Sequence, residues 1–378
     1  MQLEHFLYKD GYWDKTLNSA MDSENTLVIL FSSFDIDAVR KPFQEIIEAY
    51  PHSLIMGAST AGTIYMDTIE EESCSVTVAK FTQTKLKLVT TSVKTMADSF
   101  EAGKHLGAAL QDESLKHIFT LSNGLHTNGS ELVGGLDASF KTQIPVSGAL
   151  AGDNGSFEAT WVITGKKIDP HGITALGFYG DKFRMSASFK DGLDIFGIQR
   201  LVTKSKANVL YELDGKPALE IYKKYLGPQA ENLPLSALSF PLSIETDEEH
   251  NITRTILAVN FDDNSMTFAG DIPEGSYVSF MKANLDRVIT GANQAAKELD
   301  FTEHNDEQIL SIAISCIGRK AILKQRAEEE LEAVLEQMPK NTLQIGMYSF
   351  GEISPAGNKC CELHNQTMTL TAIWEQDA

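Results

Sequence analysis

Two strand-like segments follow each other along the chain, and no helix separates them. They span residues 75–81 and 85–93, and in the second Leu86 and Leu88 alternate with lysines, as expected of a half-buried strand. Strands that follow one another without a helix favour antiparallel pairing, because a parallel pair needs a long crossover connection. The chain is therefore not expected to form a purely doubly wound parallel sheet.

Helical patterns alternate with strand patterns over the first 200 residues. The first helical face consists of Val39, Phe43 and Ile46, which repeat at the spacing of an α-helix. Further helices are expected at residues 102–110 and 132–140. Strands are expected at residues 27–31, 54–57, 117–121, 144–150, 160–164, 174–179 and 185–189.

A second unit is expected to begin near Gly197, with no low-complexity linker before it. Its predicted elements are a helix at 216–226, a hairpin at 257–268, and helices at 277–299 and 331–338. The sequence thus predicts a mixed α/β (α+β) fold of two packed domains, residues 1–196 and 197–378. Their sheets are expected to be mixed, largely antiparallel and flanked by helices.

The charge balance limits the partners of the chain. Lys and Arg number 32 and Asp and Glu number 52, which gives a formal charge of −20 in 378 residues. This balance disfavours nucleic acid and anionic membranes, both of which attract basic surfaces. The apolar runs, such as residues 27–31, are shorter than the about 20 residues that span a bilayer. The first residues lack the basic and apolar regions of a signal peptide, so a soluble cytoplasmic protein is expected.

Three loops are rich in small residues. They cover residues 57–62, 122–130 and 147–155, and each follows a β-rich run. Small residues allow backbone N–H groups to approach a ligand or another backbone closely. Each loop alone is explained as a tight turn, whereas three in one unit favour a shared binding crevice on a rigid scaffold.

Histidine and cysteine positions suggest few metal sites. His126 lies in the second loop and His364 follows the Cys360–Cys361 pair, so these two histidines are the candidates for ligand or metal binding. The cysteine pair is too close for a conventional zinc claw, and a zinc site completed by His364 is a weak alternative. His105 is expected in the core. Surface positions are expected for His5, His52, His250 and His304.

Signatures of enzymes are absent from the sequence. It contains no G-x-x-x-x-G-K-[ST], G-x-S-x-G or H-E-x-x-H motif. The four cysteines are few and irregularly spaced, so no disulfide framework is expected. Cys316 lies close to Arg319, which makes an activated thiolate one alternative. It also follows the apolar residues 312–314, which favours a buried structural thiol.

The three loops, together with motifs in the second half, resemble the FIST family, in which a FIST N region precedes a FIST C region. The resemblance rests on residues 57–62, 122–124, 145–153, Gly177, 211–215, 315–319, 346–355 and 363–367. It implies that residues 1–196 form a FIST N-like domain and residues 197–378 a FIST C-like domain.

This resemblance implies a stand-alone bacterial sensor in signal transduction that binds a small ligand and regulates a separate protein. Some similar proteins, of the NosP type, are haemoproteins that sense nitric oxide (NO) and regulate a histidine kinase, biofilm formation or cyclic-di-GMP signalling. Non-covalent haem b is therefore the expected cofactor, and His126 and His364 are its candidate axial ligands. A homodimer is left open, and a catalytic function is not expected.

The ligand is expected in a crevice between the FIST N loops and the elements around Arg319, Glu352 and His364. Arg319 is expected either to clamp a carboxylate of an amino-acid-like ligand or to pair with Glu352. The full set of candidate ligand-binding residues is Ser59, Thr60, Asn123, His126, Asn128, Asp153, Arg319, Glu352, His364 and Asn365.

Three alternatives stay open beside the haem sensor. The first is a sensor of an amino acid or another small metabolite without haem. The second is a cysteine-dependent enzyme that uses Cys316 with Arg319 and His364. The third is an interaction scaffold whose acidic surface steers a basic partner.

Overall fold

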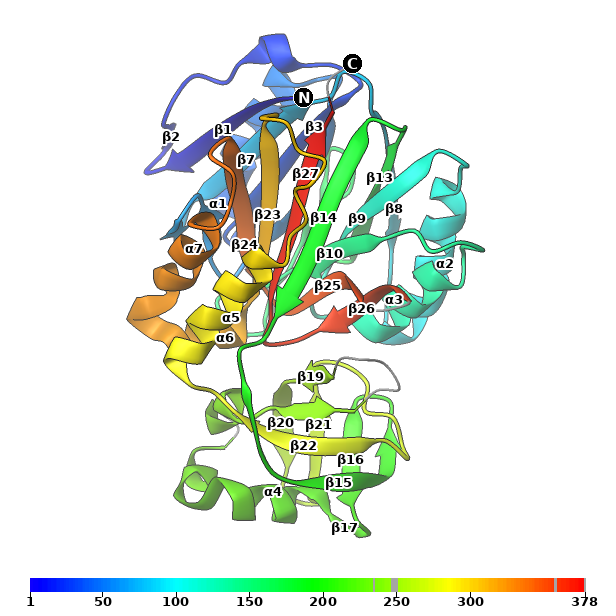
Figure 1. The fold of residues 1–378 in the computed structure, drawn as a ribbon, viewed down its shortest axis with the longest axis vertical. Helices are drawn as coiled ribbons and strands as arrows, with labels where there is room; N and C mark the ends of the chain where they lie inside the picture. Colours follow the sequence, from blue (N-terminus) through cyan, green and yellow to red (C-terminus); the bar gives the residue numbers. More distant parts are fainter. Residues whose placement is uncertain (234, 246–250, 357–358, 377–378) are drawn as a thin grey trace.

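The computed structural model of the chain describes residues 1–233, 235–245, 251–356 and 359–376. A large lobe is built from the first and last parts of the chain, and a small lobe lies below it in the view of Figure 1. The sheets of the large lobe are mixed and the recorded strand pairs of the small lobe are antiparallel, with helices packed on both, which confirms the expected mixed α/β fold. Within the described residues, no helix is long and apolar enough to cross a membrane.

The large lobe contains three copies of one four-strand unit. The first copy consists of β1 (Gln2–Lys9), β3 (Thr26–Ser32), α1 (Ile36–Ala49), β4 (Leu54–Ser59) and β7 (Cys74–Lys80). Its sheet order is β4–β3–β7–β1, with a short β2 (Tyr12–Trp13) beyond β1. Within the unit only β3 and β4 are parallel, and α1 makes the crossover between them.

The other two copies repeat this strand order. The second contains β8 (Lys85–Ser92), α2 (Ser99–Leu110), β9 (Leu115–Ser122), α3 (Gly129–Asp137), β10 (Val146–Leu150) and β13 (Gly172–Tyr179). The third contains β14 (Phe183–Lys190), α5 (Leu285–Lys297), β23 (Ile309–Cys316), α6 (Ile317–Leu323), α7 (Ala327–Leu335), β24 (Thr342–Ser349) and β27 (Met368–Glu375). Their orders, β10–β9–β13–β8 and β24–β23–β27–β14, match that of the first copy. The lobe therefore has an internal threefold repeat.

Each copy also adds a hairpin to the sheet of another copy. The hairpins are β5 (Thr63–Tyr65) with β6 (Thr68–Glu70), β11 (Val162–Ile163) with β12 (Ile168–Asp169), and β25 (Gly351–Ala356) with β26 (Lys359–His364). β5 pairs with β24 of the third copy, β11 pairs with β4 of the first, and β25 pairs with β10 of the second. Through this cyclic exchange of hairpins, each copy forms backbone hydrogen bonds with the other two, and the N-terminal and C-terminal copies belong to one lobe.

The three sheets enclose a shared apolar core. Phe31, Phe119 and Ile312, one from each sheet, are fully buried in it. Helices cover the outer faces: α1 covers the first sheet, α2 and α3 the second, and α5 and α7 the third. Burial on both faces explains why strands such as β3 are continuous apolar runs in the sequence.

The small lobe is inserted between β14 and α5 and has its own core around Tyr222 and Phe280. Its elements are β15 (Asp194–Lys206), β16 (Val209–Leu213), β17 (Lys216–Pro217), α4 (Ala218–Leu226), the 3-10 helix η4 (Leu235–Ser239), β18 (Leu242–Ile244), β19 (Ile252–Arg254), β20 (Ile256–Asn260), β21 (Ser265–Phe268) and β22 (Tyr277–Lys282). After this lobe the chain returns to the large lobe. The expected division into residues 1–196 and 197–378 stays a prediction. Strands from the two ranges pair with each other, as β14 does with β27 and β10 with β25.

Three expectations from the sequence are wrong in detail. Residues 277–299 do not form one helix, because 277–282 are strand β22 and α5 begins only at Leu285, where the Asn284 side chain caps it. His105 is exposed, since the buried face of α2 passes through its neighbours. His5 is buried, only 4% exposed, because its strand is covered and its ring packs on Tyr65. His52 is exposed as expected and His304 is partly buried, whereas His250 lies outside the described residues.

Candidate functional site

The carboxyl ends of the three parallel strand pairs meet at one place in the large lobe. Gly152 N donates to Ser59 O at 3.0 Å, and Ala151 N donates to Ser122 O at 2.7 Å. Ala61 N donates to Tyr348 O at 2.9 Å. These bonds bring together the three loops rich in small residues, as the sequence suggested. They also add the end of β24, which joins the third copy to the same place.

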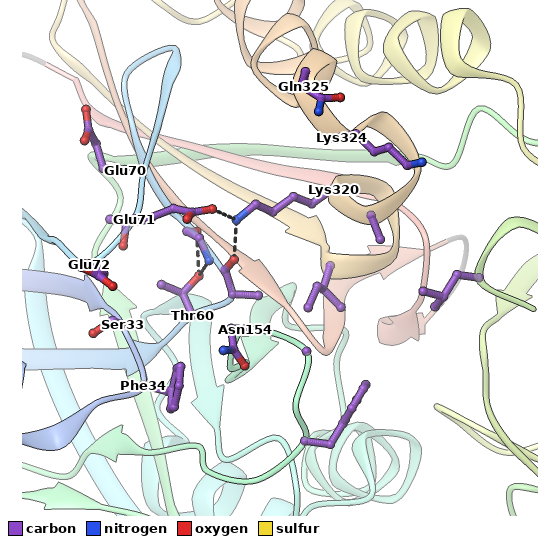
Figure 2. Close-up of a pocket in the computed structure, with 18 of the residues that line it drawn as sticks. Ser33, Phe34, Thr60, Glu70, Glu71, Glu72, Asn154, Lys320, Lys324 and Gln325 are labelled. Carbon is purple, nitrogen blue, oxygen red and sulfur yellow. Dashed lines mark hydrogen bonds and ion pairs between the residues drawn. The ribbon is translucent and has the colours of Figure 1, made fainter. Parts of the chain in front are cut away.

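A cavity of about 930 Å³ opens beside these loops, between the large lobe and the small lobe. The large lobe contributes the turn after β3, the segment between β4 and β5, the turn after β6 and one face of α6 (Figure 2). The small lobe contributes Leu238, Ile256 and Leu257. A ligand held here contacts both lobes at once.

A lysine and a glutamate face each other in the wall of this cavity. Lys320 of α6 lies 2.9 Å from Glu71 Oε1 and donates to Ala61 O at 2.8 Å (Figure 2). Its ammonium also lies 5.6 Å from the centre of the Tyr348 ring. The hydrogen bond from Lys320 lowers the pKa of the Glu71 carboxyl from its usual value. The site thus presents one positive and one negative group side by side.

The lining carries further charged groups and an apolar part. Glu70 and Glu72 flank Glu71, and Lys324 follows Lys320 one helical turn later. The apolar part of the wall consists of Phe34, Phe157, Leu238, Ile256, Leu257 and Ile317. Apolar walls with a few convergent polar groups are typical of small-molecule sites.

Thr60 fastens the loop that forms the cavity floor. Its hydroxyl lies 2.7 Å from Gly62 O and accepts a hydrogen bond from Tyr348 N at 3.0 Å. Gly62 leaves room for two side chains, because a Cβ there would lie 2.8 Å from Lys320 Nζ and 3.0 Å from the Tyr348 ring. Of the ten residues predicted to bind ligand, Thr60 lines this cavity.

Ser59 and Asp153 shape neighbouring loops from buried positions. Ser59 Oγ accepts from Trp161 N at 3.0 Å. Asp153 accepts from the backbone N–H groups of residues 155, 157, 158 and 159. Burial raises the pKa of Asp153, but these donors outweigh it and hold the pKa below its usual value. Asp153 therefore fixes the segment that carries the cavity residue Asn154.

Arg319 does not line the cavity. It forms its ion pair with Glu330 and not with Glu352, the partner expected from the sequence. The guanidinium is fully buried, with Nη2 2.7 Å from Glu330 Oε2. Glu352 instead accepts from the Ser349 hydroxyl at 2.8 Å and from the Thr367 hydroxyl at 2.9 Å. Burial raises the pKa of Glu352 to about 7. The expected clamp on a ligand carboxylate is therefore not built from Arg319.

Asn123, His126 and Asn128 organise the second loop and do not line the cavity. Asn123 Oδ1 accepts from His126 N at 2.7 Å. The His126 ring lies 4.5 Å from the ring of His171. Asn128 caps α3 and donates to Asp271 Oδ1 of the small lobe at 3.1 Å.

His364 and Asn365 lie in the buried contact between the lobes. The His364 ring stacks on Phe189 with centroids 3.9 Å apart. Asn365 Oδ1 accepts from Thr255 N of the small lobe at 3.4 Å. Across the described part of the chain, no group of three or more His, Cys, Asp or Glu side chains is arranged to hold a metal ion.

Lys320, Glu71 and Glu330 were missed from the sequence, and so was His117. The sequence pattern does indicate that Glu330 is buried, because it shares an apolar helix face with Ala327, Leu331 and Val334. His117 is fully buried in β9, and burial lowers its pKa to about 3, so it is a neutral core residue. Lys320 and Glu71 lie far apart in the sequence, and no motif joins them.

A second cavity of about 890 Å³ lies between α3, β26 and the small lobe. Its α3 face consists of Ser130, Val133, Gly134 and Asp137, the same helical spacing that α6 presents to the first cavity. The two cavities thus occupy corresponding positions in two copies of the repeat. The side chain of Cys360 lies outside the described set, whereas Cys361 is buried at the edge of this cavity.

Comparison with known proteins gives a family match over most of the chain. The FIST N domain matches residues 26–216, and the FIST C domain matches residues 218–355. The uncharacterized protein MJ1623 of Methanocaldococcus jannaschii is 27% identical over 209 residues, which are 51% of this chain. The match spans 39% of the length of that relative.

Among solved structures, the crystal structure of cyanuric acid hydrolase from A. caulinodans aligns over 100% of this chain and 99% of its own. The TM-score is 0.37 and the sequence identity is 6%. A likeness at this level supports no argument about function.

Proposed function

Because the chain belongs to the FIST family, whose domains sense small ligands in signalling proteins, we propose that the cavity between the lobes holds its ligand. One observation carries this proposal: the cavity lies where loops of all three repeats and the small lobe meet. A separate signalling protein, such as a histidine kinase, then reads the liganded state.

The charges of the cavity favour an amino-acid-like ligand. Its carboxylate fits Lys320 and its ammonium fits Glu71, since charge-assisted hydrogen bonds of this kind are the strong ones. A side chain of the ligand fits the apolar wall around Phe34 and Ile317. Lys320 takes the role that the sequence suggested for its neighbour Arg319.

The residues of the cavity do not fit haem. Among the described lining residues there is no histidine, cysteine, methionine or tyrosine, the side chains that hold haem iron. His126 and His364 lie outside the lining, so neither is placed to bind iron there. Haem b and NO sensing stay a prediction from the resemblance, and no step of the function proposed here uses them.

Cys316 gives little support to a cysteine-dependent enzyme. It is buried at the end of β23, and burial raises the pKa of its thiol. A nucleophilic cysteine needs an accessible thiolate. This environment suits the structural thiol that the sequence also suggested.

The proposal is tested by a panel of the twenty L-amino acids. We expect at least one to raise the melting temperature of the protein, because a ligand at 100 times its Kd stabilises a fold by about 2.7 kcal/mol. In calorimetric titrations of that ligand, Lys320→Met and Glu71→Gln should each weaken binding at least about tenfold. Lys116→Met is the matched control, since Lys116 forms a surface ion pair with Asp181 and lies outside the cavity lining. Binding that is unchanged in both cavity variants would contradict the proposal.

A further inference from the structure

Two short linkers connect the lobes, and the first is packed tightly. It spans residues 191–193 and follows β14, whereas the second precedes α5 at residues 283–284. A Cβ at Gly192 would lie 2.2 Å from Arg287 O, and Gly192 has a φ of +70°. Gly291 faces it from α5, since a Cβ there would lie 2.9 Å from Gly192 Cα. The linker path thus depends closely on the position of α5.

Arg319 binds both the linker and α5. Its Nη1 donates to Asp191 O at 2.6 Å, and its Nη2 donates to Val288 O at 2.8 Å. It is the residue directly before Lys320, which lines the cavity. One short helix, α6, therefore contacts the linker through Arg319 and the ligand cavity through the next residue, Lys320.

A buried chain of polar contacts leads from the cavity to Arg319. The Tyr348 backbone N and O are hydrogen-bonded to Thr60 and Ala61 in the cavity floor. The Tyr348 hydroxyl donates to Glu330 Oε1 at 2.8 Å, and Glu330 Oε2 accepts from Arg319 Nε at 2.9 Å. All three side chains are fully buried, so water does not weaken these contacts.

We propose that Tyr348, Glu330 and Arg319 form a relay that couples occupancy of the cavity to the orientation of the small lobe. A ligand that draws Lys320 away from Ala61 O and Glu71 shifts α6 and the loop under Tyr348. The shift reaches the linker through Glu330 and Arg319. This inference rests on the proposed function, since it takes that cavity as the ligand site, and it adds how binding becomes a signal.

The relay is tested without a ligand, by filling the cavity with a side chain. Ala321 lines the cavity on α6, and Ala321→Trp places an indole in it. Spin labels on non-natural residues at position 37 of α1 and position 220 of α4, both exposed, report the distance between the lobes. We expect Ala321→Trp to change the mean distance by more than about 2 Å, a typical size for a domain rearrangement.

The relay predicts that this change depends on one hydroxyl group. Adding Tyr348→Phe to Ala321→Trp should reduce the distance change by at least half. Tyr179→Phe is the matched control, because it removes another buried hydroxyl, which donates to Leu110 O at 2.8 Å in the second repeat. An equal change with and without the Tyr348 hydroxyl, or no change in Ala321→Trp itself, would overturn the relay. Since no ligand is added, this result is independent of the amino-acid panel.

Hydrogen exchange gives a second measurement in case Ala321→Trp fails to fold. In the ligand-free protein, Tyr348→Phe should speed amide exchange at residues 191–193 and 288–291 at least about tenfold, because Glu330 loses a donor that holds it on Arg319. Tyr179→Phe should leave these amides unchanged. Equal exchange in the two variants would also reject the relay.

Discussion

Replacing Glu330 by glutamine is expected to destabilise the large lobe by about 3–5 kcal/mol, because it leaves the buried Arg319 guanidinium without a countercharge. Both side chains are 0% exposed. The Glu330 carboxylate also accepts from the Ser315 and Tyr348 hydroxyls at 2.9 and 2.8 Å. The midpoint of urea unfolding should fall, with little change in its slope.

The residue before Glu330 supplies the control. Glu329 lies on the same helix and pairs with Arg326 at the surface, where both side chains are about two-fifths exposed. Glu329→Gln should cost less than about 1 kcal/mol, as exposed ion pairs do. An equal loss of unfolding free energy in Glu330→Gln and Glu329→Gln would contradict this prediction, because the buried pair would then stabilise the fold no more than the exposed pair.

Glu375→Gln is expected to remove a part of the stability that depends on pH. The carboxylate accepts from the backbone N–H groups of Thr82, Gln83 and Thr84 at 2.9, 2.8 and 2.6 Å. Burial raises the pKa of Glu375, but these donors and the Thr82 hydroxyl outweigh it and lower the pKa to about 2. The loss at pH 7 should be about 2 kcal/mol, from several charge-assisted hydrogen bonds.

The direction of the pH effect follows from the lowered pKa. Because the folded-state pKa lies below the unfolded value, near 4.5, the contribution is fully present above pH 4.5 and is lost as the pH falls towards 2. The wild-type protein and Glu375→Gln should thus differ most at neutral pH and converge near pH 2. Glu303→Gln, at an exposed carboxylate of the same lobe, should stay close to wild type throughout. A constant difference between Glu375→Gln and wild type at all pH values would contradict this assignment.

Much of the fold was predictable because its signals are local. The apolar run of β3 and the helical spacing of apolar residues in α1 each identify their element from neighbouring residues alone. The threefold repeat is marked only weakly in the sequence. The second strand of each parallel pair carries one glycine, Gly57, Gly148 or Gly346, where a Cβ would meet a carbonyl oxygen of the preceding strand, and a single glycine does not identify a repeat. The exchange of hairpins was also hidden, because β5 and β24 pair although about 280 residues of sequence separate them.

The site was predictable in its loops and not in its charged groups. Residues 57–62 and 147–155 were expected to meet because small residues after strands permit close backbone approach, and they do meet. The guanidinium of Arg319 suits a ligand carboxylate, but in the structure it is fully buried, and the next residue, Lys320, lines the cavity. Which of two neighbours faces a cavity depends on packing between distant segments, which sequence spacing does not report.

Hydrogen exchange with and without the amino acid that most stabilises the protein tests the central claim most directly. We expect protection at residues 60–63, 70–72 and 256–257 and in α6, the segments that line the cavity between the lobes. Protection confined to α3 and residues 361–363, which line the second cavity, would contradict the claim and place the ligand there.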